Sequence, residues 1–179
     1  YLIVSILLFW ELIFPEELAT FGGSFSFANI PTSAFSLSLG NTVTSGLGLP
    51  SSLQQNPANL WHHGKLNTDL THFKDPFDAE FISLFGSFGS NRYFQKYRFG
   101  LGMIIHQITG IEFYDEEATF LDYSENKNFG IYSGISRRIS NYYIGTGLTY
   151  LSANFTNIPE SGPFKIYYIF STIGIGINE

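Results

Sequence analysis

The chain has 179 residues, enough for one domain with a sizeable core, and its formal net charge of -6 argues against a nucleic-acid partner. Charged residues make up only 13% and aromatic residues 18% of the chain, whereas soluble domains carry about 25% charged residues. No internal apolar run reaches the ~18 residues of a spanning helix. Because a surface that faces lipid needs little charge, the composition favours a transmembrane β-barrel over a soluble β-sandwich with an aromatic core. The absence of Cys excludes disulfides and thiolate metal sites.

The N-terminal residues YLIVSILLFW are almost wholly apolar and have the length of the hydrophobic core of a signal peptide. A basic leader and an initiator Met are missing, since the only Met is Met103. We therefore expect residues 1–20 to be a signal-peptide remnant, with cleavage near Ala19. The alternative is a buried N-terminal strand or helix.

Residues 21–60 form a nearly uncharged segment that is rich in small residues and closes on Asn56-Pro57-Ala58. Pro57 fixes its own φ and pushes Asn56 out of the helical region. The Asn56 side chain can bond the backbone two residues on, in an Asx turn, and Ala58 is small enough for close packing. We expect a hatch-like or plug segment with a rigid corner at Asn56, Pro57 and Ala58. An ordinary Asn-Pro loop is the alternative.

Residues 61–179 have the pattern of an antiparallel meander, in which apolar runs are separated by turn residues. We expect seven strands, at Leu66–Phe73, Ala79–Phe88, Tyr97–Gln107, Ile111–Leu121, Asn128–Arg138, Tyr142–Phe155 and Phe164–Ile177. Turns are expected between them at 74–76, 89–91, 109–110, 124–126, 140–141 and 159–163. Seven strands leave two unpaired edges, and the last predicted strand lies at the end of the chain. We therefore expect the chain to be a fragment of a larger barrel, whose missing C-terminal part supplies the remaining strands.

Side chains alternate between bulky and small along the expected strands. Tyr142, Ile144, Leu148 and Tyr150 share a face opposite Gly145, Gly147 and Thr149; Tyr167, Ile169, Ile173, Ile175 and Ile177 oppose Thr172, Gly174 and Gly176; Phe99, Leu101, Met103 and Ile105 oppose Gly100 and Gly102. The bulky face is expected to meet lipid. The glycine face would let the backbone of a plug come close, or it marks bulges and strong coiling. Tyrosines near the strand ends suit a bilayer interface: Tyr93, Tyr97, Tyr123, Tyr142, Tyr143, Tyr167 and Tyr168.

Two segments resemble a known family. The run FSFANIPTSA at Phe25–Ala34, followed by LSLG at Leu37–Gly40, resembles the start of mature PorQ-type proteins, although Phe35 and Asn41 stand where that family has Arg and Gly. The step Gln55-Asn56-Pro57-Ala58 resembles the NPA signature that the PorV/PorQ family shares with the wider FadL-like barrels. Three later segments, Tyr97–Gly102, Gly110–Asp115 and Ser124–Arg138, are also similar in order to the third-to-fifth strand region of that group.

The resemblance implies an all-β fold, an antiparallel up-and-down transmembrane β-barrel of the bacterial outer membrane with an N-terminal hatch-like segment. Such a barrel has roughly fourteen strands, of which this chain would hold about half. The implied function is an accessory role in type IX protein secretion, through protein contacts at a barrel rim. The alternative is a FadL-like channel for hydrophobic small molecules. The expected partners are outer-membrane lipid, together with other secretion-system proteins or a hydrophobic ligand.

The polar residues give little sign of catalysis, and we expect neither an enzyme nor a cofactor. The four histidines, His62, His63, His72 and His106, lack the spacing of a metal site. Residues 115–117 are consecutive acids that could hold Ca²⁺ but are more typical of a solvated loop. No phosphate-binding loop or hydrolase elbow occurs.

Overall fold

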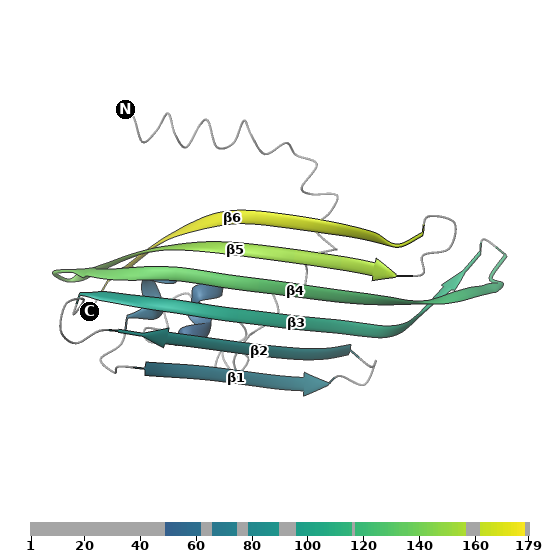
Figure 1. The fold of residues 1–179 in the computed structure, drawn as a ribbon, viewed down its shortest axis with the longest axis horizontal. Coiled ribbons are helices and arrows are strands. Elements are labelled where there is room, and N and C mark those ends of the chain that lie inside the picture. Colours follow the sequence, from purple (N-terminus) through teal and green to yellow (C-terminus); the bar gives the residue numbers. More distant parts are fainter. Residues whose placement is uncertain are drawn as a thin grey trace, which may run out of the picture.

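The computed structural model describes residues 49–61, 66–74, 79–89, 96–115, 117–156 and 162–177. Its main element is one six-stranded antiparallel sheet in which each strand pairs with the next along the chain (Figure 1). The strands are β1 (Leu66–Lys74), β2 (Ala79–Phe88), β3 (Tyr97–Tyr114), β4 (Phe120–Ile139), β5 (Tyr142–Thr156) and β6 (Phe164–Ile177). The sheet is an open meander, with β1 and β6 at its two edges. The expectation of an all-β, antiparallel up-and-down arrangement is confirmed.

Two short 3₁₀-helices precede the sheet in the chain, η4 (Pro50–Gln54) and η5 (Pro57–Leu60). They lie against one face of the sheet, toward its end away from the β3–β4 hairpin (Figure 1). Helix η4 contacts mainly β2 and β3, whereas η5 contacts mainly β4, β5 and β6. No helix within the described ranges is long and apolar enough to cross a membrane.

The predicted alternation of bulky and small side chains is confirmed along β3, β5 and β6. We call the face of the sheet that carries the bulky side chains the apolar face and the opposite one the glycine face. On the apolar face Leu148 is 54% and Ile173 78% exposed, while on the glycine face Thr149 and Leu151 are buried. The tyrosines divide between the two faces. Tyr142 and Tyr167 lie on the apolar face, but Tyr143 is buried on the glycine face, so it does not belong to an outward-facing aromatic row.

The apolar face has a polar boundary at one end. One register row crosses all six strands there and consists of Lys74, Glu80, Gln107, Lys127, Asn154 and Lys165. The next four rows toward the β4–β5 turn contain no Asp, Glu, Lys or Arg among the paired residues of this face. The middle of the face is therefore an uncharged band that spans the whole sheet.

The predicted number of strands is wrong. Residues 109–110 are not a turn, because Gly110, at φ 71°, lies inside β3 where the register with β4 shifts between Ile108 and Ile111. Such a shift is a β-bulge, which bends a strand without ending it. The chain reverses instead at Asp115–Thr119. There one Asp115 carboxylate oxygen accepts hydrogen bonds from the backbone N–H groups of Glu117 (2.9 Å) and Thr119 (2.7 Å).

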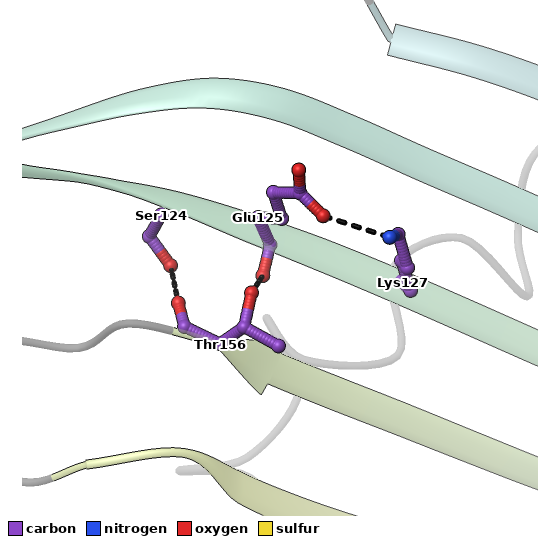
Figure 2. Close-up of polar contacts among 4 residues, drawn as sticks. All are labelled: Ser124, Glu125, Lys127 and Thr156. Atoms are coloured by element: carbon purple, nitrogen blue, oxygen red, sulfur yellow. Dashed lines mark hydrogen bonds and ion pairs between the residues drawn. The ribbon is translucent and has the colours of Figure 1, made fainter.

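The expected strand Ile111–Leu121 is thus divided between β3 and β4, and the expected turn at 124–126 lies inside β4. Figure 2 shows why these residues stay in the strand. Ser124 Oγ donates to the carbonyl oxygen of Thr156, and Thr156 Oγ1 donates to that of Glu125 at 3.2 Å. Glu125 also forms an ion pair with Lys127 at 2.7 Å. The two hydrogen bonds fasten β4 to Thr156, the last residue of β5, whereas the ion pair lies within β4.

Beyond this point β3 and β4 continue as a two-stranded hairpin. The last pair between β2 and β3 is Ala79 with Ile108, and the last pair between β4 and β5 is Glu125 with Thr156. The hairpin Gly110–Ser124 therefore projects past the end of the sheet (Figure 1).

Replacing Gly110 by Val should loosen this hairpin, because an L side chain at positive φ costs about 1–2 kcal/mol. We expect amide hydrogen exchange across residues 110–124 to accelerate about 5–30-fold, with little change elsewhere in the sheet. Gly86→Ala in β2 is the control, since the nearest atom to a methyl group there is 3.9 Å away. Equal effects of the two variants on the hairpin would contradict this account of Gly110.

Candidate functional site

The segment Leu49–Trp61 packs on the glycine face and is the candidate site. Each of its 3₁₀-helices begins with a proline, which suits the first helical position because it has no N–H to satisfy. In η4 the buried residues are Pro50, Ser51, Ser52 and Leu53, and all of η5 is buried. A segment without charge is thus enclosed against a sheet face that combines glycines with large buried apolar side chains.

Asn56, Pro57 and Ala58 form the corner between the two helices. Asn56 is extended, at φ -143° and ψ 98°, and its side-chain oxygen accepts a hydrogen bond from the Ala58 N–H at 3.1 Å. This is the Asx turn that the sequence predicts, and it also caps η5. The Asn56 amide donates to the carbonyl oxygen of Ile175 in β6 at 3.3 Å, so the corner is tied to the sheet.

The sheet holds the corner from β4 as well. Ser136 Oγ donates to the carbonyl oxygen of Ala58 at 2.9 Å, and both residues are fully buried. This bond satisfies a backbone acceptor that would otherwise be buried without a partner, which costs about 1–3 kcal/mol. The sequence analysis did not identify Ser136. Its position on the glycine face follows from alternation along β4, but its partner depends on how the segment docks.

Glycines make this docking possible. A methyl group at Gly145 would lie 2.7 Å from the Pro57 carbonyl oxygen, and one at Gly174 would lie 3.1 Å from the Ala58 nitrogen. Similarly, a methyl group at Gly100 would lie 2.7 Å from Leu60 Cδ2. The pairing of β5 with β6 runs from Tyr142 to Phe155 without a register shift. Of the two interpretations of the glycine face, close approach of a segment is therefore the one observed at Gly145 and Gly174.

Apolar contacts also hold the segment Leu49–Trp61 on the glycine face. Leu53 and Leu60 join a buried cluster on the glycine face whose other members are Phe81, Phe85, Ile104, Tyr132 and Leu151. At the end of the segment, Trp61 stacks on Tyr143 with ring centroids 5.8 Å apart. The guanidinium groups of Arg98 and Arg138 lie 4.3 and 6.0 Å from the centre of the Trp61 ring. These cation–π contacts retain two positive charges beside the buried tryptophan.

The other candidate residues do not converge. His72 contacts Glu80 at 2.9 Å near the end of β1, and His106 is buried beside the Asn128 amide at 3.1 Å. Asp115 uses its carboxylate to close the hairpin turn. His62, His63 and Glu116 lie outside the described residues. Within the part of the chain that the structure describes, no group of three or more His, Cys, Asp or Glu side chains could hold a metal ion.

Comparison of the chain with protein-family models, with curated proteins and with solved structures finds no significant match in any of the three.

Replacing Gly145 by Val should displace the segment Leu49–Trp61, because the new side chain would occupy the space of the Pro57 and Ala58 backbone. Overpacking of this kind costs about 1–3 kcal/mol. Urea unfolding followed by tryptophan fluorescence should show a lower midpoint, and Trp61 should become more accessible to acrylamide. Gly86→Val, on the apolar face, is the matched control. If both variants shift the midpoint equally, the close approach at Gly145 does not stabilise the fold.

Proposed function

We propose that the sheet is part of a transmembrane β-barrel of the bacterial outer membrane, with its apolar face toward lipid and its glycine face toward the lumen. The observation that carries this proposal is the exposure of large apolar side chains on the uncovered face of the sheet. The face covered by Leu49–Trp61 combines glycines and polar side chains with a buried apolar cluster, and the opposite face exposes large aliphatic side chains such as Leu148, Ile169 and Ile173. Among the described residues nothing covers the apolar face. Water would oppose this arrangement, and lipid favours it.

The width of the uncharged band supports the same proposal. On the apolar face of β4 the charged residues Lys127 and Arg137 are roughly ten residues apart, which matches the 9–11 residues of a strand that crosses a bilayer at about 45°. The two open edges, β1 and β6, would need further strands in lipid, since unpaired backbone groups are not tolerated there. In this barrel Leu49–Trp61 would be the part of the hatch that rests on the wall.

We propose a direction for this barrel from its longest projection, the hairpin Gly110–Ser124. This hairpin lies at the end of the sheet opposite the turn at Ser140 and Asn141, and at that turn end residues 89–96 also join β2 to β3. Outer-membrane barrels have short turns on the periplasmic side and longer loops outside the cell. The Asn56-Pro57-Ala58 corner then lies toward the periplasm, and the hairpin projects from the cell.

We infer that the protein is an accessory component of type IX secretion of the PorV/PorQ type, which acts through protein contacts. The hairpin supports a contact role, because it projects beyond the sheet and exposes Tyr114, Phe120, Leu121 and Tyr123. Tyr114 donates a hydrogen bond to the Glu112 carboxylate at 2.5 Å, which raises the pKa of Tyr114. Aromatic side chains of this kind are enriched where proteins bind one another. The occupied glycine face further favours this role over an open pore.

The alternative is a FadL-like channel for hydrophobic small molecules. One observation favours it: the wall beneath η4 and η5 is apolar, with Phe81, Phe85 and Leu151 buried against Leu53 and Leu60. If the segment moved aside, this surface would line a passage suited to an apolar solute. Both functions use the same fold, so the fold does not separate them.

A deletion strain of the source bacterium separates the two functions. For the secretion role we expect type IX cargo to accumulate in the periplasm, while uptake of a radiolabelled long-chain fatty acid stays normal. The triple variant Tyr114→Ser, Phe120→Ser, Tyr123→Ser should reproduce this defect in complementation. Glu117→Gln in the same hairpin is the control that keeps the aromatic side chains. Lost uptake with intact secretion would favour the channel, and no change in either would contradict both roles.

A further inference from the structure

A furrow crosses the apolar face near the β4–β5 turn. One hollow of about 410 Å³ lies beside Arg137 and Ile144, and a second of about 520 Å³ lies over Ser133 and Ser171. The two are continuous, because Ile135 and Thr146 line both. The furrow exists because small side chains alternate here with large ones. Ser133 pairs with Leu101 and with Leu148, and Leu148 pairs with Ser171.

The furrow has a cation at one end and only apolar or small side chains along the rest of its length. Arg137 is exposed, and its guanidinium lies 5.3 Å from the centre of the Tyr97 ring. From Arg137 to Ser133 along β4 the distance is roughly 13 Å, at about 3.3 Å per residue. Within the described ranges no carboxylate forms an ion pair with Arg137. The acids Glu112, Asp115, Glu117 and Asp122 all lie in the projecting hairpin at the opposite end of β3 and β4.

Beneath most of the furrow the backbone is engaged in the sheet. Strands β4 and β5 have hydrogen-bonded neighbours on both sides, whereas β6, which carries Ser171, is an edge strand. An extended peptide lying over β4 and β5 would therefore find no free backbone groups to bond there. A flexible hydrocarbon chain needs none, since its transfer into an apolar furrow is favourable without hydrogen bonds.

We propose that this furrow binds a phospholipid with an anionic headgroup, whose phosphate contacts Arg137 and whose acyl chain lies along Ile135, Thr146 and Ser133. The guanidinium fork matches the geometry of a phosphate, and Tyr97 holds it at the boundary of the uncharged band. The inference rests on the proposed function, because it needs the apolar face to meet lipid. It adds a specific lipid site at the short-turn end of the barrel.

The test uses the full chain refolded in dodecyl maltoside micelles that contain dioleoyl phosphatidylglycerol, with retained lipid counted by native mass spectrometry. The wild-type protein should retain phosphatidylglycerol more tightly than the zwitterionic phosphatidylcholine. Arg137→Gln should weaken retention of phosphatidylglycerol about five-fold, and Thr146→Phe should weaken retention of both lipids by filling the hollow. Lys127→Gln, on the same face and strand but at the opposite boundary, should change neither.

Equal retention by Arg137→Gln and the wild-type protein would overturn the proposal, as would displacement of the lipid by inorganic phosphate alone. Loss of lipid in Lys127→Gln equal to that in Arg137→Gln would also overturn it, because the site would then be general surface charge. Protease protection in phosphatidylcholine vesicles tests insertion separately. A protein with its complete set of barrel strands that inserts but retains no lipid contradicts only this site, whereas one that fails to insert contradicts the proposed barrel.

Discussion

The register of β4, β5 and β6 is the constraint on which the rest of the structure depends. A slip of one residue would exchange the two faces of a strand, placing Ile144 and Leu148 against Leu49–Trp61 and turning Gly145 and Gly147 outward. The observed register is unbroken and places Ser136, Gly145 and Gly174 where the corner at Asn56, Pro57 and Ala58 meets the sheet. The same register assembles the uncharged band on the other face. The contacts of the glycine face with Leu49–Trp61 and the uncharged band on the apolar face therefore both follow from this register.

Features that depend on neighbouring residues could be predicted from the sequence. Alternation assigned Leu148 and Gly147 to opposite faces correctly, because the side-chain period of a strand is a local property. The Asx turn at Asn56 followed from Asn-Pro chemistry for the same reason. The turn expected at Gly110 was wrong, since a glycine at positive φ serves either a turn or a bulge. Only the pairing of Ile111 with Ser124 shows that β3 continues.

Contacts between distant parts of the chain could not be predicted in this way. The residues around Ser136 in the sequence do not show that its hydroxyl bonds the Ala58 carbonyl oxygen. In the same way, the sequence around Arg98 does not show that its guanidinium lies over Trp61. Tyr143 was placed in an interfacial row because of its residue type, but its register position turns it toward Trp61. Only part of the candidate site could therefore be predicted. The corner at Asn56, Pro57 and Ala58 was predicted from the sequence, whereas the sheet residues that contact it were identified only in the structure.

The central claim is that the apolar face meets lipid, and adjacent residues of β5 test it directly. The chain contains no Cys, so Leu148→Cys and Thr149→Cys can each carry a single nitroxide label in bilayers of phosphatidylcholine. Electron paramagnetic resonance would then compare collisions with oxygen, which concentrates in lipid, and with a water-soluble nickel chelate. The account predicts frequent oxygen and rare nickel collisions at position 148, and few collisions of either kind at the enclosed position 149. Frequent nickel collisions at 148 would contradict it, because that face would then lie in water.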